Sequence, residues 1–331
     1  MNMLGDYQLA VLALGSIGFG LFLLVKGGDW TIDAAAFLAE RLGVSKLLIG
    51  ATIVAFGTSA PELFTSVNAN LSGFPGISLG NVVGSNIANI LLILGAVALV
   101  YALRTDPREV RADLLMMGLA TLLLVGLMMY GVVTQWAGLG LFALLVVFVV
   151  FRFWTDKGAG LPDLAEDAHD EGIDEKGIAT IGKALVFLAL GLAALVVGSE
   201  VLVQGAVAAG GALGVPEAII GVTVVAVGTS LPELSTCLAA AVKRQTSMII
   251  GNIVGSNLFN ILSIVGITAM IKPLAIDPSL ADLEMWLMLG LTALLVVWLL
   301  TVAKIGRASG IAMLVAYLAF TAYQYQDVVF G

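Results

Sequence analysis

The stretch "GATIVAFGTSAPELFTSV" at residues 50–67 places a proline and a glutamate inside an otherwise apolar segment. The chain nearly repeats this stretch as "GVTVVAVGTSLPELSTCL" at residues 221–238. Proline has no N–H for the helical hydrogen bond, and its ring crowds the carbonyl group four residues earlier. Each stretch therefore predicts a helix that is interrupted at its Gly-x-x-x-Pro segment, directly before a carboxylate.

The composition of the chain is typical of a polytopic membrane protein. Of its 331 residues, 60% are hydrophobic and 11% are charged, whereas a soluble domain carries roughly twice that charged fraction. Apolar segments of about 20 residues, long enough to cross the hydrocarbon core, recur along the chain. The N-terminal segment has no basic region and no clear small-residue cleavage site, so we expect a first span rather than a signal peptide. A basic patch is absent from the sequence, so no nucleic-acid partner is expected.

We expect ten transmembrane helices. Their approximate limits are residues 8–25, 47–70, 77–100, 112–130, 136–154, 183–204, 218–241, 248–271, 283–302 and 309–326. With these limits, all but one of the 15 Lys and Arg residues lie in connections on one side of the membrane, and Lys272 alone lies on the other. Because Lys and Arg concentrate in cytoplasmic loops, we predict a multi-pass protein of the cell (inner) membrane. Both termini are expected outside, and the loop between helices 5 and 6 in the cytoplasm.

The two halves of the chain are copies of one unit. An offset of 171 residues, from residue 50 to residue 221, aligns them without a gap, and "GNVVGSNIANILLILG" (80–95) then meets "GNIVGSNLFNILSIVG" (251–266). Each unit contains five predicted helices, and this odd number inverts the second copy in the membrane. Inverted repeats of this kind are a transporter architecture with the binding site near the midplane. The predicted fold is therefore an all-α polytopic membrane protein of ten transmembrane helices, arranged as two inverted five-helix repeats with discontinuous helices 2 and 7.

This repeat divides the chain into three segments. They are the first five-helix repeat at 1–154, with its motif at 50–95, an acidic cytoplasmic loop at 155–182, and the second five-helix repeat at 183–331, with its motif at 221–266. The loop lacks the spacing of acidic residues that an EF-hand calcium loop requires, so we interpret it as a solvated linker.

The polar residues of the two motifs supply oxygen ligands. Glu62 and Glu233 are ionisable residues inside predicted spans, which makes both candidates for a functional site. The hydroxyl and amide side chains around them recur at equivalent positions: Thr58, Ser59, Asn81, Ser85 and Asn89 in the first motif, and Thr229, Ser230, Asn252, Ser256 and Asn260 in the second. Taken singly, a serine or asparagine in a span indicates hydrogen bonding between helices, which is the simpler interpretation of Asn86 and Asn257.

These oxygen atoms together favour a hard cation as ligand. The interrupted helices add main-chain carbonyl groups, which a membrane tolerates only where they line a cavity or meet another partner, such as a cation. Ligation by six or more oxygens suits Ca2+, whose charge two carboxylates neutralise, and the same oxygens suit Na+ in smaller subsites.

The paired motifs resemble those of a known family. "GTSAPEL" with "GNVVGSNIAN", and "GTSLPEL" with "GNIVGSNLFN", are similar to the two alpha-repeats of the calcium/cation antiporter superfamily, and most closely to its prokaryotic sodium/calcium exchanger branch. The resemblance covers nearly the whole chain. It implies that helices 2, 3, 7 and 8 form the ion-binding core, and that helices 1 and 6 slide against this core to alternate access.

The resemblance also implies a role for each motif residue. Ca2+ is expected to bind Glu62 and Glu233 together with the carbonyl groups of Thr58 and Thr229, and Na+ is expected to use the same glutamates in flanking subsites. The implied Na+ ligands come from both repeats: Ser59, Ser256, Thr229 and the Ala226 carbonyl in one subsite, Ser230, Ser85, Thr58 and the Ala55 carbonyl in its mirror, and Asn89 and Asn260 in the middle. Some archaeal and the potassium-dependent exchangers carry Asp at the position of Asn260, so the missing charge argues against potassium dependence here.

The sequence therefore predicts a secondary active antiporter that exchanges Na+ for Ca2+ by alternating access at one shared midplane site. Transported Ca2+ and Na+ are its expected partners besides the lipid bilayer, and no cofactor is expected. A Ca2+/H+ antiporter of the same fold is the alternative, because buried glutamates can also carry protons. A cation channel is less favoured, because inverted repeats around a closed midplane site indicate alternating access. An enzyme is not expected, because the H-E-x-x-H pair and a paired catalytic-aspartate motif are both missing from the sequence.

Overall fold

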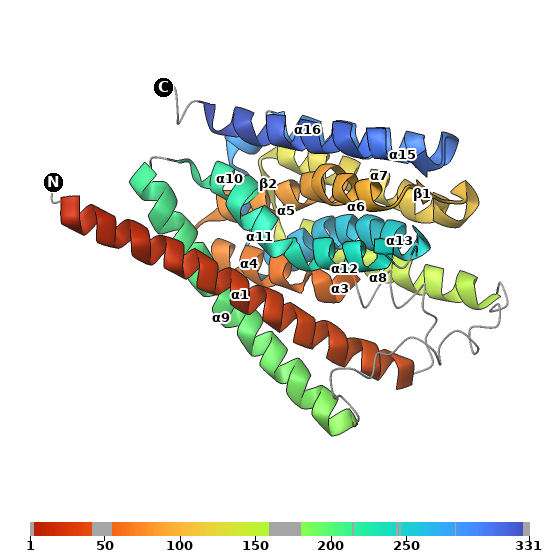
Figure 1. The fold of residues 1–331 in the computed structure, drawn as a ribbon, viewed down its shortest axis with the longest axis horizontal. Helices are drawn as coiled ribbons and strands as arrows, with labels where there is room; N and C mark the ends of the chain where they lie inside the picture. Colours follow the sequence, from red (N-terminus) through yellow and green to blue (C-terminus); the bar gives the residue numbers. More distant parts are fainter. Residues whose placement is uncertain are drawn as a thin grey trace.

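The computed structural model describes residues 3–41, 55–158, 180–213, 215–242, 244, 246–281 and 283–326. Within these ranges the chain is almost entirely helical (Figure 1). The helices are α1 (Met3–Arg41), α3 (Ala55–Thr58), α4 (Ala60–Leu71), α5 (Pro75–Ala88), η2 (Asn89–Ile93), α6 (Leu94–Val100), α7 (Pro107–Tyr130), α8 (Gln135–Gly158), α9 (Ile181–Leu213), α10 (Glu217–Ile220), η4 (Gly221–Val225), α11 (Ala226–Thr229), α12 (Leu231–Val242), α13 (Thr246–Leu258), η5 (Phe259–Val265), α14 (Gly266–Ile271), η6 (Pro278–Ala281), α15 (Leu283–Thr301) and α16 (Arg307–Gln324). The strands are β1 (Leu103–Arg104), β2 (Val132–Val133), β3 (Leu274–Ala275) and β4 (Lys304–Ile305). Most of the predicted acidic loop and the first part of predicted helix 2 lie outside the described residues.

Six of the described helices are long and apolar enough to cross a membrane. They comprise Pro75–Val100, Pro107–Tyr130, Gln135–Thr155, Ile181–Gly210, Ile249–Ile271 and Pro278–Thr301. A seventh span results if the pair Glu217–Thr229 and Leu231–Val242, bent by 42°, counts as one, and Leu12–Gly27 is a shorter apolar helix. The chain is therefore a helical multi-pass membrane protein, and the full number of ten spans stays a prediction.

Two helices are interrupted at equivalent serines. α3 and α4 meet at Ser59, which has φ −85° and ψ 5°. α11 and α12 meet at Ser230, which has nearly the same angles, φ −85° and ψ 8°. The prolines lie in the first turn of α4 and of α12, where the missing N–H has no helical partner to lose. Each proline therefore starts the second half of its helix, and Glu62 and Glu233 lie in that same first turn.

Two short antiparallel strand pairs join the two halves of the chain. β1 pairs with β4, and β2 pairs with β3. β1 precedes and β2 follows α7, a helix of 24 residues, which is about 36 Å long, so the two pairs lie at opposite ends of the helix bundle (Figure 1). The start of α1 and the end of α16 both lie toward the end that carries β2 (Figure 1). The all-α prediction missed these strands because two residues are too few to show the alternating pattern of a strand.

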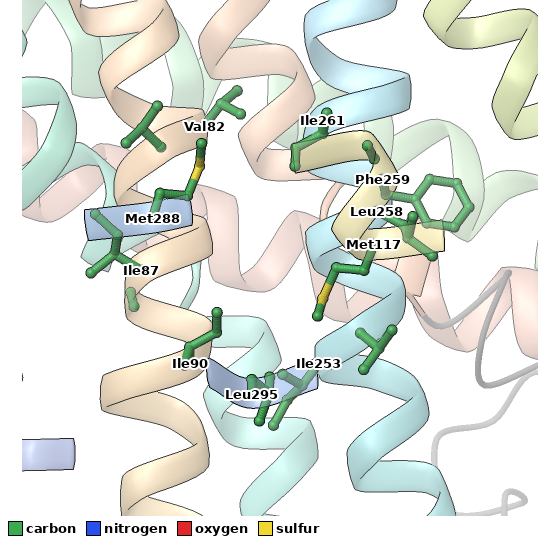
Figure 2. Packing of buried hydrophobic residues seen from close by; sticks show 14 of the residues in the cluster. Val82, Ile87, Ile90, Met117, Ile253, Leu258, Phe259, Ile261, Met288 and Leu295 are labelled. Carbon is green, nitrogen blue, oxygen red and sulfur yellow. The ribbon is translucent and has the colours of Figure 1, made fainter. Parts of the chain in front are cut away.

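The helices that carry the motifs lie inside the bundle, and α1 and α9 cross each other on one side of it (Figure 1). This crossing is close, because a Cβ atom on Gly20 of α1 would lie 2.8 Å from the carbonyl oxygen of Gly198 in α9. The main hydrophobic core joins the two halves. Figure 2 shows Met288 of the second half beside Val82 and Ile87 of the first, and all three side chains belong to this core. The motif helices of the two halves thus pack against each other through this shared core.

Candidate ion-binding site

The two interrupted helices bring both glutamates into the interior of the protein. Glu62 is 1% exposed and Glu233 is 2% exposed, although both are ionisable. The ion pairs seen among the described residues, such as Lys26 with Asp29 and Arg152 with Asp113, involve neither glutamate. Buried charges are normally paired with an opposite charge or coordinate a metal ion. Metal coordination is the explanation that fits Glu62 and Glu233.

Each glutamate accepts a hydrogen bond from the serine at the other interruption. Ser59 Oγ donates to Glu233 Oε1 over 3.0 Å, and Ser230 Oγ donates to Glu62 Oε1 over 2.9 Å. Two residues 174 positions apart in the chain are thereby in direct contact. The two motifs therefore build one site and not two separate ones.

Two further serines extend this network. Ser85 Oγ lies 3.1 Å from Ser230 Oγ, and Ser256 Oγ lies 3.4 Å from Glu233 Oε1. Ser85 comes from α5 and Ser256 from α13, which flank the interrupted helices. Glu62 and Glu233 thus both belong to a network of serine hydroxyl groups, which are oxygen ligands without charge.

Several polar atoms in the site have no hydrogen-bond partner. Of eight such buried side-chain atoms in the described part of the chain, five belong to residues predicted for the ion site. They are Glu62 Oε2, Glu233 Oε2, Asn89 Oδ1, and both Oδ1 and Nδ2 of Asn260. Buried polar atoms are nearly always hydrogen-bonded, so this concentration of unpartnered oxygens indicates a place where a ligand completes the bonding.

The donor set indicates which ligand fits. No group of three or more His, Cys, Asp or Glu side chains that could hold a metal occurs among the described residues. A metal at Glu62 and Glu233 therefore has to take its remaining ligands from hydroxyl, amide and carbonyl oxygens. Such ligands suit Na+ or Ca2+ and not the transition metals that favour nitrogen and sulfur.

A family model described as "Sodium/calcium exchanger protein" matches residues 12–154 and 183–326 of the chain. The chain belongs to the sodium/calcium exchanger family. The family resemblance of the two motifs is thereby confirmed, and the protein is a membrane cation exchanger by family and not an enzyme.

Relatives and solved structures agree with this assignment over nearly full length. Sodium/calcium exchanger MaX1 of Methanosarcina acetivorans is 32% identical, with 91% of this chain and 95% of MaX1 covered. Inner membrane protein YrbG of Escherichia coli is 31% identical, with 95% of this chain and 97% of YrbG covered. A structure of the sodium-calcium exchanger NCX_Mj soaked with Na+ and Sr2+ has a TM-score of 0.67 at 32% identity, with 95% of this chain and 98% of that chain covered.

All twelve residues that the sequence predicted for the exchanger site lie in the described part of the chain, and all are buried. They are Ala55, Thr58, Ser59, Glu62, Ser85, Asn89, Ala226, Thr229, Ser230, Glu233, Ser256 and Asn260. Hydrogen bonds join Ser59, Ser230 and Ser256 directly to a glutamate. Asn89 instead donates to Asn257 Oδ1 over 3.0 Å, so Asn257 does make the interhelical bond expected of it.

The exchanger fold also contains features that the sequence did not reveal. Three motif segments are π-helical: Asn89–Ile93, Gly221–Val225 and Phe259–Val265. Such widened turns are frequent at functional sites, and here they begin at Asn89, precede Ala226, and contain Asn260. No residue type marks a π-helical turn in a sequence, so the sequence did not indicate these segments.

Asn81 is a further residue whose importance the sequence did not show. Its side chain is 0% exposed and contacts both repeats, through Glu62 and Ser66 on one side and Thr229 on the other. The repeat placed Asn81 among the polar side chains of the first motif but did not indicate these partners.

Proposed function

We propose that the protein is a secondary antiporter that exchanges Na+ for Ca2+ at the site formed by Glu62 and Glu233. One observation carries the proposal: each glutamate is bound by a hydroxyl group of the other repeat, and each keeps one buried carboxylate oxygen without a partner. Two such oxygens together balance the charge of Ca2+, and the surrounding hydroxyl and carbonyl oxygens suit Na+. The names of MaX1 and NCX_Mj, both sodium/calcium exchangers, support the same ions.

The two ions are proposed to compete for the same carboxylates. Ca2+ takes both glutamates with the Thr58 and Thr229 carbonyl groups, and Na+ takes the flanking subsites around the Ala55 and Ala226 carbonyl groups. One pair of carboxylates cannot neutralise the charges of bound Ca2+ and bound Na+ at the same time. Binding of one kind of ion therefore disfavours binding of the other. Exchange then follows from alternating access to a single shared site.

We further propose ten spans in two inverted repeats, with both termini outside and the 5–6 loop in the cytoplasm. The strand pairs support this arrangement. β1 and β3 occupy equivalent positions of the two repeats, yet β1 pairs with β4 and β3 pairs with β2 at the opposite end of α7. Equivalent segments at opposite ends of the bundle are what an inverted repeat requires.

Transport by reconstituted protein tests the proposed function. Vesicles loaded with Na+ and diluted into Na+-free medium are expected to take up radioactive Ca2+, and equal K+ gradients are expected to drive none. Glu62→Gln and Glu233→Gln keep the shape of the side chain but remove the charge, and each is expected to abolish uptake. Full uptake by either variant would refute the proposed site.

A matched control comes from another buried glutamate. Glu284 is 8% exposed and accepts a hydrogen bond from Gln324 over 2.7 Å, between α15 and the end of α16, away from the two interruptions. Glu284→Gln is therefore expected to transport like the wild type. Ca2+ uptake that follows a pH gradient without Na+ would assign the coupling to H+ instead.

A further inference from the structure

The side chain of Asn81 has one fixed orientation. Its Nδ2 donates to the main-chain oxygen of Glu62 over 3.2 Å and to Ser66 Oγ over 2.9 Å. A main-chain oxygen can only accept, so the amide nitrogen has to lie on this side. Ser66 uses its own hydrogen on the carbonyl group of Ser78, over 3.2 Å, and therefore also acts as an acceptor toward Asn81. The amide oxygen of Asn81 consequently faces the other repeat.

On that side the amide oxygen meets the hydroxyl group of Thr229. Thr229 Oγ1 lies 3.0 Å from Asn81 Oδ1, 3.1 Å from the Val225 oxygen and 3.3 Å from the Ala226 oxygen. A hydroxyl group has one hydrogen and can donate to only one of these acceptors at a time. If the hydrogen pointed at a main-chain oxygen, or at the carboxylate of Glu62 that also faces Thr229, the lone pairs of Asn81 and Thr229 would face each other in a buried place. The hydrogen of Thr229 therefore belongs to Asn81.

This orientation leaves the carbonyl group of Ala226 available. The Ala226 oxygen accepts the N–H of Ser230 over 3.1 Å, and its second lone pair is not taken by Thr229. The lone pairs of the Thr229 hydroxyl are free as well, because its hydrogen points away. Two oxygens of the Ala226 subsite are thus presented without a hydrogen in front of them.

The mirror subsite differs. Thr58 Oγ1 donates to the Ala55 oxygen over 3.2 Å, and the same oxygen accepts the N–H of Ser59 over 2.9 Å. Asn252, the equivalent of Asn81, has no contact with Thr58 among these hydrogen bonds: its Oδ1 lies 3.3 Å from Ser256 Oγ, whose one hydrogen also faces Glu233 Oε1 at 3.4 Å, and its Nδ2 donates to the sulfur of Cys237 over 3.4 Å. Both lone pairs of the Ala55 carbonyl are therefore occupied by hydrogens. The two subsites have nearly the same residues but opposite hydroxyl orientations.

We propose that Asn81 is a positioning residue that prepares the Ala226 subsite for Na+ by holding the hydroxyl hydrogen of Thr229. Asn81 itself contacts no ion, and it acts on the Na+ subsite through Thr229. This inference rests on the proposed Na+/Ca2+ exchange. The inference predicts an effect on Na+ binding and not on Ca2+ binding, because Ca2+ is proposed to use the Thr229 carbonyl group and Na+ the Thr229 hydroxyl group.

Asn81→Leu tests the inference, because leucine has a similar size and no acceptor. The hydrogen of Thr229 then turns to the Ala226 oxygen. We expect the Na+ concentration for half-maximal Na+-driven Ca2+ uptake to rise about five- to tenfold, the equivalent of one hydrogen bond. The Ca2+ concentration for half-maximal Ca2+/Ca2+ self-exchange without Na+ is expected to change by less than about twofold, because that exchange does not use the hydroxyl group. Glu284→Gln, whose side chain contacts Gln324 and not the ion site, is the control, and its Na+ dependence is expected to stay that of the wild type.

A double variant distinguishes positioning from a structural role. Because Asn81 acts through Thr229, Asn81→Leu is expected to have no further effect on Na+ dependence in a Thr229→Val background. Additive effects, an unchanged Na+ dependence in Asn81→Leu, or an equal loss of Ca2+/Ca2+ self-exchange would each overturn the inference. If Asn81→Leu does not fold, Asn81→Ala removes the same acceptor and carries the same expectations. Wild-type protein that shows no Na+-driven uptake would instead refute the proposed exchange, and this inference with it.

Discussion

Gly84→Ala is predicted to impair transport more than it impairs folding. Gly84 lies in α5, where this helix crosses the segment that leads to Ala226. An added Cβ atom would lie 2.7 Å from Ala226 Cβ and 2.7 Å from Val222 Cα, and closer still to the carbonyl oxygen of Val222. Ordinary contacts begin at 3.4 Å, so the two segments have to separate by at least about 0.7 Å, since packed interiors have little free space.

The magnitude follows from what has to move. Overpacking of this kind costs about 1–3 kcal/mol, and alanine returns about 0.8–1 kcal/mol through its better helix propensity. The net loss of stability is therefore about 0–2 kcal/mol, which a folded membrane protein tolerates. The displacement falls on α11, a helix of only four residues that carries the predicted ligands Ala226 and Thr229. Binding sites tolerate about 0.5 Å of displacement, so we expect transport to fall at least about tenfold.

Two measurements separate these effects. The melting temperature of the purified variant is expected to fall by a few degrees, while Na+-driven Ca2+ uptake per folded protein falls about tenfold or more. Gly126→Ala is the control, because a Cβ atom on Gly126 of α7 would meet nothing within 4 Å. It is expected to leave transport unchanged and the melting temperature equal or slightly higher. Wild-type transport by Gly84→Ala would refute the idea that the α5 contact sets the position of α11.

Three further predictions concern residues outside the ion site. Lys272 and Asn70 bind each other's main-chain oxygen over 2.9 Å in both directions, so Lys272→Met is expected to lower thermal stability by about 1–2 kcal/mol while the Ca2+ concentration for half-maximal uptake stays unchanged. Arg152 contacts both carboxylate oxygens of Asp113, at 3.0 Å and 3.1 Å, and Arg152→Lys is expected to lower the melting temperature because lysine cannot make this two-point contact; an unchanged value would contradict this. Cys237 is the single cysteine and is 1% exposed, so a maleimide is expected to label the native protein slowly and the heat-unfolded protein at once, and fast native labelling would contradict its burial.

The sequence was sufficient for the main outline of the fold because the deciding residues are rare in membrane helices. A proline or an ionised side chain in a span is costly, so its repetition at a constant offset indicates selection for function rather than chance. This reasoning located the breaks near Ser59 and Ser230 and the two buried glutamates. Apolar stretches also indicated the long helices, because length and hydropathy are local properties. The strand pairs were not predicted, because a strand of two residues is too short to show an alternating hydrophobic pattern.

The contacts across the site were beyond a sequence argument because they depend on how two distant segments face each other. Spacing predicts that a serine shares a helix face with its own glutamate, three residues away. In the structure Ser59 and Ser230 each bind the glutamate of the other repeat instead. Helical periodicity describes one helix at a time, so it cannot choose between a partner on the same helix and one on the facing helix.

The difference between the two half-sites originates in a substitution that a repeat comparison treats as minor. Ser66 and Cys237 occupy equivalent positions of the two repeats, and their side chains are similar in size. Ser66 accepts from Asn81 and still donates to Ser78, whereas Cys237 accepts from Asn252 over a longer 3.4 Å. A thiol is a weak donor and a weak acceptor, so Asn252 is held less firmly than Asn81. Near-identical motifs therefore give unequal subsites, and an exchanger that binds more than one kind of ion at one place can use that inequality to tell them apart.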